Sequence, residues 1–196
     1  MTIQEQKVVL RKYIKQLKHS LSREDMKQQS EEICDLIEHQ PEFIDANIVL
    51  AYWAMDDEVN LEKLIMKWYK KKTILLPCVT NDILEIRQFT GLESMKIGPS
   101  FGILEPIGEK FTEVEKINFT IIPGIAYDID SNRMGRGKAY YDKFLLHTHT
   151  FKVGVCFNVQ LFEQIPHDAL DIKMDTVVSP KASYIHGQII KDIFLN

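Results

Sequence analysis

The chain has 196 residues, of which 45% are hydrophobic and 27% charged, and its formal net charge is −4. This composition indicates one globular α/β domain with a substantial core, expected over residues 1–196. The negative net charge gives no support to general nucleic-acid binding. The apolar runs are far shorter than the ~20 residues that span a bilayer, and residues 1–7 lack the apolar core of a signal peptide. We therefore expect a cytoplasmic protein without nucleic-acid or membrane partners.

The cysteines, Cys34, Cys78 and Cys156, are widely spaced and odd in number. That spacing indicates neither a disulfide framework nor a zinc site. Each lies among apolar residues, so we expect all three to be small core residues.

The first predicted element is an amphipathic helix over about residues 3–21. Its apolar face carries Leu10, Ile14, Leu17 and Leu21. Beside that face runs a basic stripe of Lys7, Arg11, Lys15 and Lys18. Solvated basic faces are ordinary on helices, so spacing alone predicts a surface stripe.

A second helix is predicted from Ser22, an N-cap with Asp25 three residues later, to just before Pro41. A buried strand over residues 47–53 follows, and acidic residues 56–58 come directly after it. Open α/β sheets place ligand-binding loops at such strand ends. Acidic residues also favour the start of a helix, here predicted over residues 61–69, and we interpret Asp56 and Asp57 in that way.

The remaining chain alternates between strands and helices. Residues 84–89 alternate in polarity, which predicts a half-exposed strand. Buried strands are predicted at residues 73–77, 119–122 and 152–157, and a further strand is predicted to open at Asp175. This order implies an α/β fold with a mostly parallel sheet and helices on both faces.

Residues 123–142 stand out because glycines and cations lie between a buried strand and a helix. Glycines let backbone N–H groups approach an anion, and a helix N-terminus adds its dipole. Arg133, Arg136 and Lys138 supply positive charge, and guanidinium groups suit phosphate oxygens. Asp142 is placed to hold Mg²⁺ against that phosphate. The stretch therefore predicts a phosphate site.

Two common phosphate motifs are excluded. A P-loop needs Ser or Thr after Gly137-Lys138 and glycine at position 132, where the chain has Ala139 and Asn132. A dinucleotide fingerprint needs a third glycine at the position of Tyr140. The alternative is a glycine-rich turn with solvated charges, but three cations, paired tyrosines and an early-helix carboxylate favour a site.

Residues 123–128 and 133–142 resemble the motif of the 5-formyltetrahydrofolate cyclo-ligase family, P-G-[VI]-A-[FY]-D followed after a short turn by R-[LM]-G-[RYH]-G-[KG]-G-Y-Y-D. Residues 101–106, a predicted tight loop at a wall of the site, and residues 154–178 extend the resemblance over almost the whole chain. Ser131 and Ala139 stand where the family usually has glycine. These departures matter where the backbone needs a positive φ.

The resemblance implies a single-domain, three-layer α/β/α fold with a mixed, mostly parallel sheet. It implies ATP- and Mg²⁺-dependent cyclisation of 5-formyltetrahydrofolate to 5,10-methenyltetrahydrofolate, through a phosphorylated formyl (iminium phosphate) intermediate. The substrate is expected to be a small folate, either bare or polyglutamylated, and the protein a monomer.

The resemblance also assigns residues. The catalytic assignments are Arg136, Lys138 and Tyr140. ATP binding is assigned to Lys7, Arg11, Arg133, Met134, Gly135, Arg136, Gly137, Lys138, Ala139, Tyr140 and Tyr141. Folate binding is assigned to Met55, Asn60, Arg136, Gly137, Lys138, Ala139 and Tyr140. The Mg²⁺ ligands are expected to be Asp142 and Asp175, whereas Lys15 and Lys18 are left as surface residues.

Two alternatives remain open at this stage. One is a different enzyme that moves phosphate between ATP and another small acid. The other is a non-catalytic binder of folate or nucleotide, to which Ala139 points.

Overall fold

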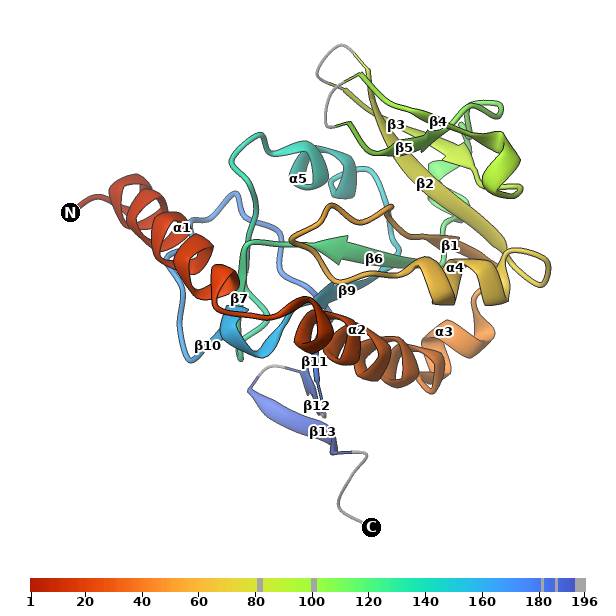
Figure 1. Cartoon of the computed structure of the whole chain (residues 1–196). Helices are drawn as coiled ribbons and strands as arrows, with labels where there is room; N and C mark the ends of the chain where they lie inside the picture. Colours follow the sequence, from red (N-terminus) through yellow and green to blue (C-terminus); the bar gives the residue numbers. More distant parts are fainter. Residues whose placement is uncertain (81–82, 100–101, 181, 186, 193–196) are drawn as a thin grey trace.

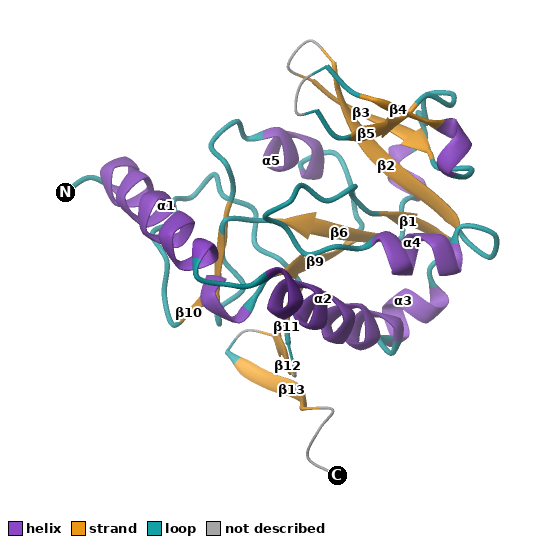
Figure 2. Ribbon diagram, in the orientation of Figure 1, coloured by secondary structure: helices purple, strands orange, loops and turns teal. Residues whose placement is uncertain are grey.

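The computed structural model describes residues 1–80, 83–99, 102–180, 182–185 and 187–192. Its framework is an eight-stranded sheet in the order β13-β12-β11-β9-β6-β1-β2-β3 (Figures 1 and 2). The strands are β1 Ile48–Leu50, β2 Thr73–Thr80, β3 Ile83–Gln88, β6 Phe119–Pro123, β9 Phe151–Val155, β11 Thr176–Ser179, β12 Ala182–Ile185 and β13 Gln188–Asp192.

The five central strands of this sheet are parallel. β1 pairs in parallel with both β2 and β6, and the parallel ladder continues through β9 to β11. β3, β12 and β13 add antiparallel edges. The central strands are almost wholly apolar and buried, as expected of strands covered on both faces. The predicted mixed, mostly parallel sheet is therefore confirmed.

Helices cover the sheet on both sides, giving three layers (Figure 1). α2 Arg23–Glu38, α3 Pro41–Asp45 and α4 Glu62–Trp68 pack on one face through the largest core cluster. α5 Tyr140–Leu145 packs on the other face, where Leu145 joins Ile122 and Val177. The single-domain three-layer α/β/α prediction is confirmed.

The first helix, α1 Ile3–His19, packs on a smaller sheet instead of the main one. That sheet has the order β10-β7-β8, with β7 Ala126–Asp128, β8 Arg133–Met134 and β10 Leu161–Phe162. Ile14 of α1 is fully buried against Ala126 and Met134. This contact places the basic stripe of α1 beside the chain that carries the phosphate motif.

The predicted start of the second helix is confirmed. Ser22 accepts a hydrogen bond from the backbone N–H of Asp25, whose carboxylate accepts one in return from the N–H of Ser22. This reciprocal capping box satisfies two N–H groups that the helix itself leaves unpaired. The three cysteines are buried core residues, as predicted.

Some sequence predictions need correction. Lys18, predicted to lie on the surface, is only 5% exposed, while Lys15 is exposed. The hairpins of β12 with β13 and of β4 Met95–Ile97 with β5 Leu104–Pro106 were not predicted. Phe101, in the predicted wall of the site, lies outside the described residues. None of the described helices is both long enough and apolar enough to cross a membrane.

Candidate active site

The candidate site lies where the order of the parallel strands reverses. From β1 the chain moves to β2 on one side, whereas β6 on the other side of β1 leads to β9 and β11. Open α/β sheets bind ligands outside the carboxyl ends of the strands at such a point. A pocket of about 810 Å³, open mouth included, lies there, and Pro123 and Gly124 at the end of β6 form part of its wall.

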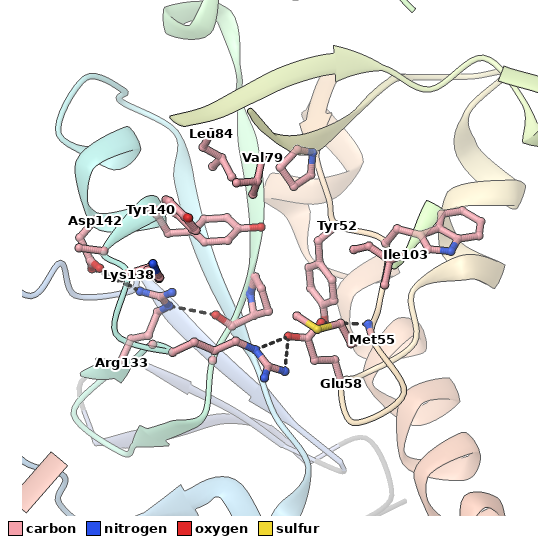
Figure 3. A pocket seen from close by; sticks show the side chains of 18 of the residues that line it. Tyr52, Met55, Glu58, Val79, Leu84, Ile103, Arg133, Lys138, Tyr140 and Asp142 are labelled. Carbon is pink, nitrogen blue, oxygen red and sulfur yellow. Dashed lines mark hydrogen bonds and ion pairs between the residues drawn. The ribbon is translucent and has the colours of Figure 1, made fainter. Parts of the chain in front are cut away.

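One wall of the pocket is mainly apolar and aromatic but includes Glu58, and the other carries the cations. Figure 3 shows Arg133, Lys138 and Tyr140 on one side, and Tyr52, Met55 and Glu58 on the other. The apolar wall is completed by Trp53, Pro77, Val79, Leu84 and Ile103. A flat heterocycle fits such an apolar wall, and an anionic group fits the cations facing it.

The loop between β8 and α5 has the backbone that the glycine pattern predicts. Gly137 has φ 99° and Ala139 has φ 54°, both in the left-handed region. Ala139 therefore adopts a conformation that favours glycine, at a cost of ~1–2 kcal/mol. Lys138 is exposed on this loop and lines the pocket.

Arg11 lies against the same loop. Its Nε donates a hydrogen bond to the carbonyl oxygen of Gly135 at 3.0 Å. A Cβ added to Gly137 would lie 3.6 Å from Nη2 of Arg11, so the guanidinium borders the glycine directly. The structure thus brings the predicted Arg11 to the predicted loop.

Arg133 is a buried cation, 6% exposed, rather than a free one. Its Nε donates to the carbonyl oxygen of Pro123 at 3.0 Å, and Nη1 lies 3.3 Å from Oδ1 of Asp142. The guanidinium also lies over the ring of Tyr141, 5.4 Å from its centroid. Arg133 therefore ties the end of β6 to the start of α5 and places Asp142 at the pocket (Figure 3).

Arg136 makes ion pairs that the sequence did not predict. Its Nη2 lies 2.7 Å from Oδ1 of Asp57 and 3.0 Å from Oε1 of Glu58. Burial would raise the pKa of Asp57, but Lys18 and then Arg136 hold that pKa below its usual value. The available sequence signal was the position of these carboxylates directly after a buried strand.

Glu58 was not among the site residues predicted from the sequence, although it lines the pocket and its side chain is only 8% exposed. Tyr52 and Tyr141 lie close enough to Glu58 for an electrostatic interaction with its carboxylate. Burial, followed by the carboxylate of Glu58, raises the pKa of both phenols.

Two of the residues assigned to folate, Met55 and Asn60, differ in whether they line the pocket. Met55 lines the pocket, whereas Asn60 lies in a neighbouring cavity that shares Met55 and Glu58 with it. The side chain of Asn60 accepts a hydrogen bond from the N–H of Glu62, the first residue of α4.

Lys7 also lies away from the pocket lining. It is 5% exposed, and its Nζ lies 2.9 Å from Asp168 and 2.5 Å from Asp171. Burial lowers the pKa of Lys7, but hydrogen bonds to Asp171 and Asp168 outweigh burial and leave it raised.

The two assigned metal ligands have different partners. Asp142 faces Arg133 in the pocket, whereas Asp175 is not among the lining residues. Asp175 Oδ2 accepts a hydrogen bond from the backbone N–H of Lys152 and pairs with its Nζ, both at 2.7 Å. The described residues contain no group of three or more His, Cys, Asp or Glu side chains arranged for a metal. A shared Mg²⁺ therefore remains a prediction.

Comparison with known proteins places this chain in a family. Residues 3–180 match the model of the 5-formyltetrahydrofolate cyclo-ligase family. A probable 5-formyltetrahydrofolate cyclo-ligase of Schizosaccharomyces pombe is 32% identical over 78% of this chain and 84% of its own length. The mouse 5-formyltetrahydrofolate cyclo-ligase is 27% identical over 90% of this chain and 95% of its own.

Solved structures agree with the sequence relatives. The 5,10-methenyltetrahydrofolate synthetase of Aquifex aeolicus superimposes with a TM-score of 0.83 and 33% identity, over 93% of each chain. The Mycoplasma pneumoniae synthetase shares the fold, with a TM-score of 0.70 and 22% identity over 89% of this chain and 98% of its own. The chain described here belongs to the 5-formyltetrahydrofolate cyclo-ligase family.

Proposed function

We propose that this protein catalyses the ATP-dependent cyclisation of 5-formyltetrahydrofolate to 5,10-methenyltetrahydrofolate, with release of ADP and phosphate. The observation that carries the proposal is the two-sided pocket at the strand switch point. Its aromatic wall suits a pterin ring, and the opposite wall presents the cations of the family motif. Family membership supplies the reaction that such a pocket would perform.

The reaction needs activation because an amide oxygen is a poor leaving group. In the proposed sequence, the N5-formyl oxygen attacks the γ-phosphorus of ATP, a new O–P bond forms, and the bond from phosphorus to ADP breaks. The formyl carbon becomes an iminium phosphate. N10 then adds to that carbon and loses its proton, and phosphate leaves with the former formyl oxygen. No covalent enzyme nucleophile is required.

Catalysis of this kind depends on positioning and on neutralising charge at the transferring phosphoryl group. We assign that role to Arg136 and Lys138, which line the cationic wall. Tyr140 lines the same wall and would pack on the pterin or support the formyl group. Arg11 would help to hold the nucleotide, since its guanidinium borders the loop glycines. The rest of the proposed ATP-binding set is Lys7, Arg133, Met134, Gly135, Gly137, Ala139 and Tyr141.

Mg²⁺ fits the chemistry of this pocket as a partner of ATP. Mg²⁺ is usually held by one or two carboxylates together with substrate phosphates and water, so a dedicated protein cage is unnecessary. Asp142 offers such a carboxylate at the pocket wall. When bound, the ion would neutralise phosphate charge.

A direct assay tests the proposal. The purified protein is mixed with 5-formyltetrahydrofolate and MgATP, and the methenyl product is followed by its absorbance. We expect product formation that requires ATP and falls steeply in Arg136→Ala, because that change removes a charge-assisted phosphate contact from an exposed loop. Absence of product with the wild-type protein would refute the proposal, and near-normal turnover of Arg136→Ala would remove that residue from it.

A further inference from the structure

The guanidinium of Arg136 is held along one edge by two consecutive carboxylates. Its Nε lies 3.2 Å and its Nη2 3.0 Å from Oε1 of Glu58, while Nη2 also lies 2.7 Å from Oδ1 of Asp57. These contacts use Nε and Nη2 and none of them involves Nη1. Among the residues that the structure describes, no side chain pairs with Nη1, so that edge can contact a phosphate oxygen.

The second oxygen of each carboxylate, the one that does not contact Arg136, also has a partner. Oε2 of Glu58 accepts a hydrogen bond from the backbone N–H of Met55 at 3.1 Å. Oδ2 of Asp57 lies 2.6 Å from Nζ of Lys18, a side chain that is only 5% exposed on α1. Two separate elements, α1 and the loop after β1, therefore support the carboxylates that hold Arg136.

The loop that carries Arg136 needs this support. Residues 136–139 are all exposed, and Gly137 and Ala139 have left-handed backbones. An arginine side chain carries about 2 kcal/mol of rotamer entropy, which opposes holding it in one orientation. Charged hydrogen bonds to carboxylates offset that entropy when the carboxylates are already fixed.

We propose that Asp57 and Glu58 are positioning residues that hold the guanidinium of Arg136 for its phosphate contact. The proposal rests on the proposed function, since the phosphate is that of ATP. It differs from the opposite role, in which these carboxylates compete with phosphate for Arg136. Positioning and competition predict opposite kinetic changes when the negative charges are removed.

The kinetic test uses Asp57→Asn and Glu58→Gln, which keep the side-chain shape and remove the charge. If they position Arg136, kcat falls on the order of 10- to 100-fold, the scale of a small misplacement in a catalytic site, and the KM for ATP changes little. A lower KM for ATP with preserved kcat would overturn the proposal. Asp56→Asn is the matched control, because Asp56 is the exposed neighbouring carboxylate outside the pocket, and should leave activity unchanged.

A double-mutant cycle separates positioning from a merely structural role. In the Arg136→Ala background, Glu58→Gln should cost nothing more in kcat/KM, because its effect passes through the missing guanidinium. An undiminished loss in that background would also overturn the proposal.

A readout without turnover distinguishes this proposal from the proposed function. The Nε–H signal of Arg136 in a ¹⁵N NMR spectrum, identified by its absence in Arg136→Lys, should be sharp in wild type and in Asp56→Asn. It should broaden or vanish in Glu58→Gln, and a signal that stays unchanged refutes the ordering of Arg136. If the wild type forms no methenyl product, the proposed function fails, and this signal still decides whether the carboxylates order Arg136.

Discussion

The Nζ of Lys7 lies 2.9 Å from Oδ2 of Asp168, although 161 positions separate the two residues in the chain. Asp171 adds a second carboxylate at 2.5 Å. Because Lys7 belongs to α1, this pair of contacts fastens the loop around residues 168–171 to the first helix. A phosphate oxygen that reached Lys7 would have to join or displace these carboxylates.

Lys7→Met tests the ATP assignment and the structural role together. The KM for ATP should rise while that for 5-formyltetrahydrofolate stays nearly constant. Unfolding free energy should fall by about 1–3 kcal/mol, less than for a fully buried pair because both aspartates are partly exposed.

The Asp168→Asn/Asp171→Asn double variant is the control for Lys7→Met, since it removes the ion pairs and keeps the cation. It should lose stability without a higher KM for ATP. A higher KM for the folate alone in Lys7→Met would contradict the assignment of Lys7 to ATP.

The same ion pair predicts a pH dependence of stability. The hydrogen bond from Lys7, followed by one from the N–H of Leu170, lowers the pKa of Asp168 below its usual 3.8. Between those two pKa values the unfolded chain binds more protons than the folded protein, so stability rises with pH there. The contribution of Asp168 is therefore fully present above about 3.8 and is lost as pH falls through the lowered pKa.

Urea unfolding at a series of acid pH values measures this contribution. The wild type should lose stability more steeply below pH ~4 than Lys7→Met, since the variant lacks the partner that lowers the pKa of Asp168. Parallel curves for the two proteins would show that the pair contributes nothing to acid stability.

The elements that the sequence predicted best are those with strong local patterns. Buried parallel strands such as β1 and β6 appear as largely apolar runs. The capping box of α2 depends on two residues that are three positions apart, Ser22 and Asp25. The loop between β8 and α5 was predicted because glycines and cations are adjacent in the chain. Each of these signals depends on neighbours in sequence.

The parts that the sequence did not reveal depend on long-range contacts. Lys18 looked like any solvated lysine because its partner, Asp57, is 39 positions away. Arg136 gave no local sign of its partners either, because Glu58 lies 78 positions away. The strands of the small sheet are two or three residues long, too short to show alternation.

Ser131→Gly should stabilise the protein. Ser131 has φ 67° and is fully buried, and its hydroxyl has no hydrogen-bond partner among the described residues. Glycine would relieve a backbone strain of ~1–2 kcal/mol. It would also remove an unpaired buried hydroxyl, which destabilises the folded state by ~1–3 kcal/mol. The greater flexibility of glycine in the unfolded chain opposes these gains by ~0.5–1 kcal/mol. A rise of about 1 kcal/mol or more in unfolding free energy is expected from these terms.

Ala139→Gly is the matched control for Ser131→Gly. Ala139 has a similar backbone, φ 54°, but is exposed and has no hydroxyl. The unfolding free energy of Ala139→Gly should rise less than that of Ser131→Gly. The turnover of Ala139→Gly should stay within about twofold of wild type, because the loop already has the conformation that glycine favours. A destabilised Ser131→Gly would mean that the hydroxyl has a partner that matters more than the strain.

Asp142 and Asp175 are the two carboxylates expected to share one Mg²⁺ ion. Replacing either by Asn keeps the shape and removes a charge, so each change should raise the Mg²⁺ concentration that gives half-maximal turnover. Two groups that share one ion act together, so the free-energy loss in Mg²⁺ binding for the double variant should be smaller than the sum of the losses for the two single variants. Titrations of activity against Mg²⁺ for the three variants measure this.

Lys152→Met sharpens the test, because Lys152 pairs with Asp175 in the structure. If Asp175 must leave Lys152 to share the ion with Asp142, removing the competing cation should lower the half-maximal Mg²⁺ concentration. This gain should vanish in the Asp175→Asn background, where there is no carboxylate to release. An unchanged Mg²⁺ midpoint in both Lys152→Met and Asp175→Asn would assign Asp175 to anchoring the start of β11, and would leave Asp142 as the carboxylate that binds the metal.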